Sequence, residues 1–253
     1  MHVYIYDSFL SQKKYNNILS RVETRITDLG LNGKICRLGA MKSIKDMVEG
    51  EVKRGAKTII AVGNDKTVNQ VINAIAPLSP SVPFGIIPIG KDENSIAAAL
   101  AIGLGEEACE TISARRIEKM DLGLANSYYF LSEAKIQNKN TILEIDDYTI
   151  EITKNGEIKI INLATSEDIP ANTVINPQDG ILELLIQTEG RKKFLFAKGE
   201  KNDQSIFPLK KMLISNSKES LLIIDGSTAI NMPVEIGIIK QKLNVIVGKE
   251  RDF

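Results

Sequence analysis

Histidine is nearly absent from this chain, since its single copy is His2. A Ser-His-Asp hydrolase, an HExxH metalloprotease and a histidine-ligated zinc site all need histidine, so this count excludes all three. Acid–base chemistry must therefore come from carboxylates, lysines or tyrosines. Cysteine is rare as well, with only Cys36 and Cys109. Two cysteines argue against a disulfide framework and are typical of a reducing cytoplasmic compartment.

Net charge and long apolar runs are also lacking. The 32 Lys and Arg residues balance 32 Asp and Glu residues in a chain of 253, which argues against nucleic acid as the main partner. The N-terminus has neither the basic region nor the apolar run of a signal peptide. The longest uncharged stretch, residues 67–90, contains four prolines and therefore cannot be a transmembrane helix.

The first half of the chain alternates predicted strands with predicted helices. Apolar runs indicate the strands, and apolar residues at helical spacing indicate the helices. The unbroken run at 58–62 is typical of a strand buried on both faces of a parallel sheet. The pattern predicts an α/β domain with a doubly wound parallel sheet. We place the strands at 2–6, 34–38, 58–62 and 84–88, and the helices at 12–29, 44–52, 68–75 and 95–113.

Beyond residue 115 the pattern changes to short β-rich runs separated by turn signals. KNGE at 154–157 predicts a hairpin with a two-residue turn. We therefore predict an all-β antiparallel sandwich, which divides the chain into an α/β domain at 1–118 and a β-sandwich domain at 119–253. The expected strands are 127–132, 148–153, 157–163, 181–187, 193–197, 221–225 and 234–239.

A polar loop follows each of two neighbouring strands. Residues 63–67, Gly-Asn-Asp-Lys-Thr, connect the strand at 58–62 to a helix, and residues 90–94, Gly-Lys-Asp-Glu-Asn, follow the next strand. A helix start directs backbone N–H groups and a positive dipole end to one point, which suits a phosphate. Taken alone, the first loop is equally an ordinary turn with Thr67 as the N-cap. Two such loops together predict a ligand site at the carboxyl edge of the sheet.

Both loop segments resemble motifs of one family. VGNDKTVNQVINAI at 62–75 resembles the GGDGTxNEVxNGL signature of the diacylglycerol kinase catalytic domain family, which includes bacterial lipid kinases and sphingosine kinases. FGIIPIGKDENSIAAAL at 84–100 is similar to the family's GIIPxGTxNDxAxxL segment. Three later segments follow in the family's order and extend the resemblance into the second half. These segments are MDLGLANSYYFL at 120–131, DGILELLIQ at 179–187 and LLIIDGSTAINMPVEIG at 221–237.

The resemblance implies a fold of the NAD kinase and diacylglycerol kinase type. Domain 1–118 would bind ATP with Mg²⁺, and domain 119–253 would bind the substrate. Phosphoryl transfer to a lipid hydroxyl, such as that of diacylglycerol, would take place in the cleft between them. The nucleotide residues implied by position are Gly63, Asn64, Asp65, Lys66, Thr67, Asn69, Gly90 and Asn94; the catalytic residues are Asp225 and Asp65; and the magnesium ligand is Asp179.

The resemblance also implies where the protein acts and with whom. A cytoplasmic protein would meet its lipid transiently at the inner membrane surface, and a homodimer is compatible with the family. The stretch 191–198 mixes basic and apolar side chains. We interpret it as a strand with solvated flanks, and contact with a lipid surface is the alternative.

Several positions depart from the family pattern. Lys66 replaces a glycine of GGDGT, and Ser227 stands where the DGE motif has its glutamate, so it cannot act as a carboxylate base. The family's N-terminal NPxSG loop is absent, because Asp7 and Ser8 follow the first strand instead. Two alternatives to an active lipid kinase therefore stay open. One is a catalytically inactive member that binds nucleotide or lipid, and the other, less favoured, is an NAD kinase.

Overall fold

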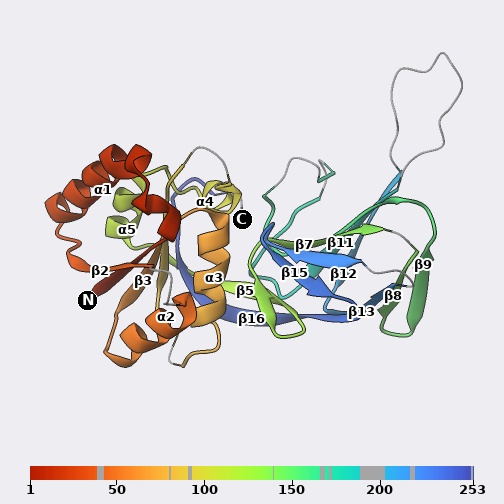
Figure 1. The fold of residues 1–253 in the computed structure, drawn as a ribbon. Coiled ribbons are helices and arrows are strands. Elements are labelled where there is room, and N and C mark those ends of the chain that lie inside the picture. Colours follow the sequence, from red (N-terminus) through yellow and green to blue (C-terminus); the bar gives the residue numbers. More distant parts are fainter. Residues whose placement is uncertain are drawn as a thin grey trace, which may run out of the picture.

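A parallel sheet with helices on both faces forms the first lobe of the computed structural model (Figure 1). Its strands are β1 (His2–Tyr6), β2 (Gly33–Arg37), β3 (Thr58–Gly63) and β4 (Phe84–Pro88), paired in the order β2-β1-β3-β4. Helices α1 (Asn16–Asp28) and α5 (Glu107–Ala114) lie on one face, and α2 (Ile44–Lys53) and α3 (Asp65–Ile75) lie on the other. The predicted α/β fold is confirmed.

Part of the chain falls outside this description. The strand predicted at 193–197 and the basic stretch at 191–198 are in that part. None of the described helices is long and apolar enough to cross a membrane. The structure describes residues 1–38, 43–79, 81–90, 93–138, 140–165, 169–170, 173–188, 203–216, 220–251 and 253.

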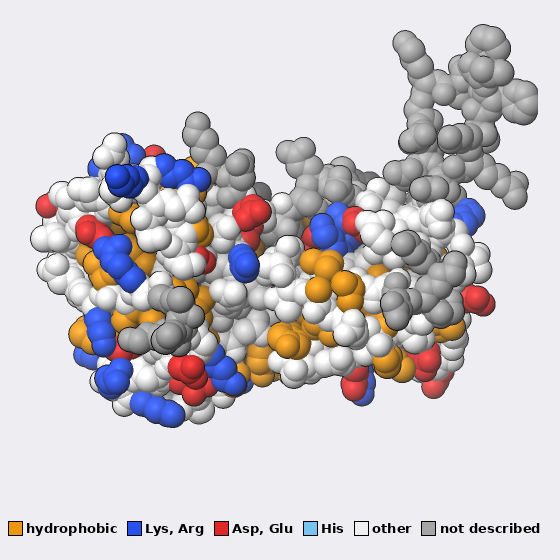
Figure 2. Space-filling view, viewed as in Figure 1, with side chains coloured by type: hydrophobic (Ala, Val, Ile, Leu, Met, Phe, Trp, Pro, Cys, Tyr) orange, Lys and Arg blue, Asp and Glu red, His pale blue; other side chains and the backbone are white. Residues whose placement is uncertain are grey.

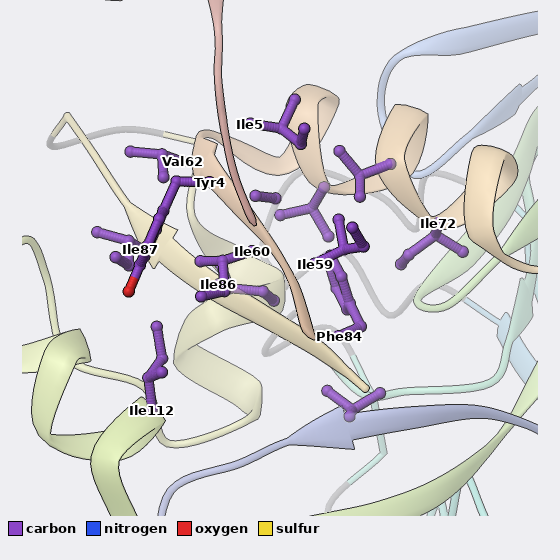
Figure 3. Close-up of a cluster of buried hydrophobic side chains, with 14 of the residues drawn as sticks. Tyr4, Ile5, Ile59, Ile60, Val62, Ile72, Phe84, Ile86, Ile87 and Ile112 are labelled. Atoms are coloured by element: carbon purple, nitrogen blue, oxygen red, sulfur yellow. The ribbon is translucent and has the colours of Figure 1, made fainter. Parts of the chain in front are cut away.

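Apolar side chains of the parallel strands pack on both faces of this sheet. Figure 3 shows Ile59, Ile60 and Ile86 at the centre of the cluster, with Ile72 of α3 and Ile112 of α5 among its members. Every residue of β3 is buried, because helices cover both faces of this central strand. Burying each such aliphatic side chain contributes about 1.5–3 kcal/mol. This core holds the carboxyl ends of β3 and β4 in fixed positions.

The single helix predicted at 95–113 is wrong, because the chain forms α4 (Ser95–Ala99) and α5 with a connection between them. Ala101 has a positive φ of 54°, and the Ile102 N–H donates to the Ala97 oxygen at 2.9 Å. This arrangement is a C-terminal helix cap. Gly105, with φ of 57°, then turns the chain into α5. The apolar residues that predicted one helix therefore belong to two short helices.

Two layers of antiparallel strands packed face to face form the second lobe, which confirms the sandwich prediction. One layer continues the parallel sheet of the first lobe, and together they form a ten-stranded sheet; the other layer is a separate six-stranded sheet. Their facing side chains form one core that contains Phe130, Leu184 and Ile236. Short 3-10 helices, η1 (Ser8–Ser11) and η2 (Lys13–Tyr15), occur only in the first lobe among the described residues. The ten-stranded sheet adds β5 (Ile117–Ala125), β6 (Tyr128–Phe130), β8 (Thr141–Ile145), β9 (Tyr148–Ile152), β13 (Lys211–Asn216) and β16 (Val234–Ile246); the six-stranded sheet contains β7 (Glu133–Asn138), β10 (Gly156–Ile161), β11 (Leu182–Thr188), β12 (Asp203–Leu209), β14 (Leu221–Ile224) and β15 (Thr228–Asn231).

The hairpin predicted at KNGE, residues 154–157, is wrong. Strand β9 pairs with β8 in the ten-stranded sheet, whereas β10 pairs with β7 and β11 in the six-stranded sheet. The segment therefore connects the two layers of the sandwich. Ile152 and Ile158, on either side of it, enter the same core from opposite sheets. Because both side chains are buried in this core from opposite sides, β9 and β10 lie in different sheets and do not pair with each other.

Strand β16 runs through both lobes (Figure 1). It pairs with β13 and β5 in the second lobe and, at Val245, with Phe84 of β4 in the first. The pairing with β5 shifts register between Ile239 and Leu243. Leu243 and Val245 pack in the core of the first lobe. The division into 1–118 and 119–253 stays a prediction. The residues that follow Leu243 pack with the first lobe.

Candidate functional site

The two polar loops meet at the carboxyl edge of the parallel sheet, which confirms their predicted proximity. The first loop comprises residues 63–67 and the second comprises residues 90–94, of which 91 and 92 lie outside the described part. The Asp65 N–H donates to the Glu93 oxygen at 2.8 Å, and the Ile89 N–H donates to the Gly63 oxygen at 2.9 Å. Backbone hydrogen bonds therefore hold the two loops side by side.

Asn64, and not Thr67, is the N-cap of α3. The Asn64 side chain accepts from the Thr67 N–H, and the Thr67 hydroxyl accepts from the Asn64 N–H, both at 3.3 Å. The same hydroxyl donates to Asp7 at 2.7 Å, which ties the end of β1 to the first loop. Gly63 is required beside it, because a Cβ there would lie 2.3 Å from the Thr67 hydroxyl oxygen. These contacts fix the start of α3.

Asp65 holds the start of the short helix α4. Its carboxylate accepts from the Ser95 N–H at 2.8 Å, from the Ser95 hydroxyl at 2.7 Å and from the Ile96 N–H at 3.2 Å. Burial raises the pKa of Asp65, while the hydrogen bonds from Ser95 and Ile96 act in the opposite direction. The predicted catalytic and nucleotide-binding residue thus also joins the two loops.

Glu93 makes the reciprocal contact with the start of α3. Its carboxylate accepts from the Asn64 amide at 2.6 Å, and its backbone oxygen accepts from the Asp65 N–H. Glu93 has a positive φ of 60°, a conformation that is uncommon for residues other than glycine. Each loop therefore places one carboxylate against the start of the helix that follows the other loop.

The other residues predicted for the nucleotide lie around these contacts. Lys66 is exposed. Gly90 has a positive φ of 107°, and its oxygen accepts from the Asn94 amide at 3.1 Å. Asn69 instead is 2% exposed and donates to Asp225 at 2.8 Å, across the boundary of the two lobes. Asn69 is therefore placed to connect the lobes, and its predicted contact with a nucleotide stays a prediction.

Asp225 lies in the turn between β14 and β15 and is almost fully buried. Besides Asn69, its carboxylate accepts from the N–H groups of Leu131, Ser132 and Glu133 at 3.0–3.1 Å. Burial raises the pKa of Asp225 to about 6, against the effect of these four donors. Its carboxylate thereby holds α3 and the segment before β7 together. A proton acceptor at this position must give up one of the four hydrogen bonds.

Two pockets meet at the joined loops. The first, called the N-lobe pocket, has a volume of about 600 Å³ and is lined by Asp7, Phe9, Tyr15, Asn64, Gln70 and Gly90 among others. The second, called the cleft pocket, has a volume of about 440 Å³ and is lined by residues of both lobes. Lys66 and Glu93 line both pockets. Figure 2 shows charged side chains of both signs next to the boundary of the lobes.

The cleft pocket is lined almost entirely by polar side chains among the described residues. Asp65 and Ser95 contribute from the first lobe. From the second lobe come Ser132, whose hydroxyl lies 2.9 Å from that of Thr165, and Asp225 with Ser227. The buried Ser227 hydroxyl has no hydrogen-bond partner among the described residues. This pocket therefore presents hydroxyl and carboxylate oxygens, together with the ammonium groups of Lys66 and Lys135, to any molecule that enters it.

Asp179, the predicted magnesium ligand, lines neither pocket. Its carboxylate accepts from the Ile181 N–H at 2.9 Å, within the turn that precedes β11. Glu183 lies near it, and burial together with the charge of Asp179 raises the pKa of Glu183 to about 7. Among the described residues, no group of three or more acidic, cysteine or histidine side chains is arranged to hold a metal ion. The metal role of Asp179 stays a prediction.

Sequence reasoning assigned no role to several residues of this site. Asp7 is the clearest case, because it follows β1 at the same sheet edge as the two loops, and that position was a usable signal. Glu93 was part of a quoted motif but matched no charged position in the family. Ser132 and Thr165 come from the second lobe, and no local pattern marks them.

Comparison with known proteins gives a consistent result. Residues 2–125 match the family model described as diacylglycerol kinase catalytic domain. The protein named diacylglycerol kinase from Bacillus subtilis (strain 168) is 24% identical over 240 residues, which cover 76% of this chain and 78% of that protein. The diacylglycerol kinase of Staphylococcus haemolyticus (strain JCSC1435) is 36% identical over 89 residues, 34% of this chain and 26% of the relative.

Solved structures show the same similarity in the fold. A crystal structure of a diacylglycerol kinase from Bacillus anthracis str. Sterne superposes with a TM-score of 0.78 at 18% identity, covering 98% of this chain and 96% of that one. A putative diacylglycerol kinase from the same organism superposes with a TM-score of 0.77. The resemblance inferred from the motifs and the predicted fold class are therefore both confirmed.

Proposed function

We propose that the chain, whose residues 2–125 match the family model described as diacylglycerol kinase catalytic domain, is a lipid kinase-like enzyme that transfers a phosphoryl group from ATP to a lipid hydroxyl, such as that of diacylglycerol. The observation that carries this proposal is the junction of the two pockets at Lys66 and Glu93. Phosphoryl transfer depends on positioning and charge neutralisation. Donor and acceptor pockets that meet at these two residues would supply the positioning.

The N-lobe pocket would hold the nucleotide. Its volume of about 600 Å³ falls in the usual range of small-molecule sites. Phe9 and Tyr15, whose ring centroids lie 5.2 Å apart, give it an aromatic wall on which a base can stack. Asn64, Lys66 and Gly90 line it beside the start of α3, where phosphates are favoured by the helix dipole. The phosphate chain would thus point toward the cleft pocket.

A divalent cation, Mg²⁺ in our proposal, fits this arrangement. Mg²⁺ is usually held by one or two carboxylates together with substrate phosphates. Among the described residues, Oδ2 of Asp65 accepts two hydrogen bonds, but Oδ1 accepts only one and keeps a lone pair for a cation. Asp65 would therefore hold the ion, which when bound neutralises charge on the transferred group.

Asp225 is the residue that we assign to the acceptor side. It lines the cleft pocket next to Ser227, and burial raises its pKa to about 6, near the range in which general bases work well. To take the proton of an acceptor hydroxyl, its carboxylate must release one of its four donors. We expect such assistance to be worth roughly 10²–10⁴-fold in rate.

The same residue favours a second candidate function, a member that binds nucleotide or lipid without transfer. All four hydrogen bonds of Asp225 are satisfied within the protein. Ser227 offers a hydroxyl where the family motif has a carboxylate. A protein with this site could bind both ligands in the two pockets and still lack a group to activate the acceptor.

The test is transfer of labelled phosphate from ATP, with Mg²⁺, to diacylglycerol and other lipid alcohols in detergent micelles and to NAD. An active lipid kinase labels the lipid, and Asp225→Asn then lowers kcat by about 10²–10⁴-fold with nearly unchanged nucleotide affinity. Asp147→Asn, in an exposed turn, is the matched control. Nucleotide binding without any transfer supports the second candidate, and labelling of NAD alone contradicts both.

The protein's place in the cell follows from the same proposal. We infer that it works in the cytoplasm and meets its lipid at the inner membrane surface. Sedimentation with vesicles that contain diacylglycerol tests this contact, with vesicles of phosphatidylcholine alone as the control. Equal sedimentation with both kinds of vesicle would contradict recognition of the lipid.

A further inference from the structure

We propose that Glu93 is a specificity-determining residue whose carboxylate lies where a phosphate would approach the start of α3 and cancels the gain in affinity that each added phosphate would otherwise bring. This inference rests on the nucleotide role proposed for the N-lobe pocket. It concerns a residue to which neither the sequence motifs nor the comparisons assign a role. Its basis is the contact of Glu93 with Asn64 and its place between the two pockets.

The start of α3 is already occupied by groups of the protein. The Asn64 N–H is bonded to the Thr67 hydroxyl, the Asp65 N–H to the Glu93 oxygen, and the Thr67 N–H to the Asn64 side chain. A phosphate placed there finds few free backbone donors, although a helix start normally supplies several. It must also displace the Glu93 carboxylate from the Asn64 amide, a contact of 2.6 Å.

Charge at the junction adds to this effect. Lys66 and Glu93 are the charged residues shared by the two pockets, so their charges offset each other at the point where the phosphates would pass. Further into the cleft pocket, three carboxylates, those of Asp65, Glu133 and Asp225, outnumber one lysine, Lys135. Like charges a few ångströms apart repel each other, more strongly in a partly buried site than in water, and this repulsion grows with each phosphate.

The backbone holds Glu93 in this place. Its positive φ of 60° and the bond from the Asp65 N–H to its backbone oxygen fix the residue against the first loop. The carboxylate of Glu93 is therefore placed beside the Asn64 amide. Asp65, in the first loop, in turn accepts hydrogen bonds from Ser95 and Ile96, which follow the second loop. The two loops are therefore held together by hydrogen bonds in both directions.

Binding of AMP, ADP and ATP, measured by isothermal titration calorimetry in EDTA, tests the proposal. EDTA keeps each nucleotide free of metal, so that the phosphate charges are unshielded. In wild type we expect the three affinities to lie within about threefold of one another. In Glu93→Gln, which keeps an oxygen for Asn64 and removes the charge, we expect ATP to bind about tenfold tighter, with AMP nearly unchanged.

Two further variants make the result decisive. Glu151→Gln, in the exposed part of β9, changes the net charge equally and should leave the series as in wild type. Glu93→Gly suits the positive φ and should give the same gain for ATP as Glu93→Gln, which excludes an effect of misfolding.

Each other outcome overturns the proposal in a recognisable way. If all variants bind ATP as wild type does, Glu93 does not control phosphate binding, while the nucleotide site stands. If AMP gains as much as ATP, the substitution has opened the loop instead of removing a repulsion. If neither wild type nor Glu93→Gln binds any nucleotide, the nucleotide site fails together with this inference.

Discussion

Replacing Asp225 with asparagine tests which of two opposing effects dominates at the boundary of the lobes. Burial raises the pKa of the carboxyl group from 3.8 to about 6, whereas its four hydrogen-bond donors favour the charged form. In the folded protein, Asp225 therefore binds a proton at a higher pH than in the unfolded chain. Its ionisation costs stability as pH rises from about 4 to 6.

The size of the effect follows from the shift in pKa. A rise of about 2 pH units corresponds to about 3 kcal/mol of stability lost between acidic and neutral pH. Asparagine cannot ionise, so the variant does not have this loss. The amide nitrogen of asparagine instead faces two of the N–H groups that donate to the carboxylate. The loss of these hydrogen bonds lowers the free energy of unfolding by about 1–3 kcal/mol at every pH.

Asp225→Asn should therefore destabilise the protein at pH 4 and have little effect at pH 7.5. Urea unfolding of wild type and variant at both pH values measures this difference, and an unchanged m-value shows that the same surface unfolds. Asp147→Asn, in an exposed turn, controls for the general pH response of the chain. The ionisation of all other carboxyl groups cancels in the comparison.

The sign of the pH dependence shows whether burial or the four hydrogen-bond donors dominate the pKa of Asp225. If the variant loses more stability at pH 7.5 than at pH 4, the four donors outweigh burial and the pKa of Asp225 is lowered. Asp225 would then be a weak proton acceptor at neutral pH, which would also count against its proposed role as a base. A difference that is the same at both pH values would refute the assigned shift altogether.

Two further predictions concern the framework of the site. Gly63→Ala should lower the melting temperature by roughly 2–10 °C, because its Cβ would meet the Thr67 hydroxyl and overpacking costs about 1–3 kcal/mol; Gly237→Ala, with open space around it, is the control, and equal melting of the two would contradict the crowding argument. Asp121→Asn should lower the free energy of unfolding by about 1–3 kcal/mol, because the buried Asp121 carboxylate accepts from the Gly180 and Gln241 N–H groups and an amide can accept from only one; chemical denaturation checks this, and an unchanged midpoint would show that the turn adjusts.

The first lobe was predictable because its signals are local. The unbroken apolar run of β3 and the helical spacing in α3 are each contained in fewer than a dozen residues, so the pattern alone indicated their order. The strands missed in the second lobe lacked such signals. β7, for example, contains Glu133, Lys135 and Gln137 on one face, because only its other face is buried in the sandwich.

The candidate site was predictable in its segments but not in its contacts. The motif resemblance indicated the first loop, the second loop and the segment around Asp225. The bonds of Asp225 to Asn69 and to the backbone at Leu131 join residues that are far apart in the chain, and no local pattern encodes such pairings. The position of Glu93 against Asn64 likewise follows from a positive φ that sequence periodicity does not register.

The path of β16 has a consequence for how the protein is made. Val245 covers the edge of β4 at Phe84, and the ribosome reaches it roughly 160 residues later, which at about 5–20 residues per second takes on the order of 10–30 s. During that time β4 presents an open, apolar edge, and such edges are templates for pairing with other chains. The nascent first lobe is therefore most prone to aggregate before the last strand has emerged. A chain that stops before residue 243 would leave this edge of β4 uncovered.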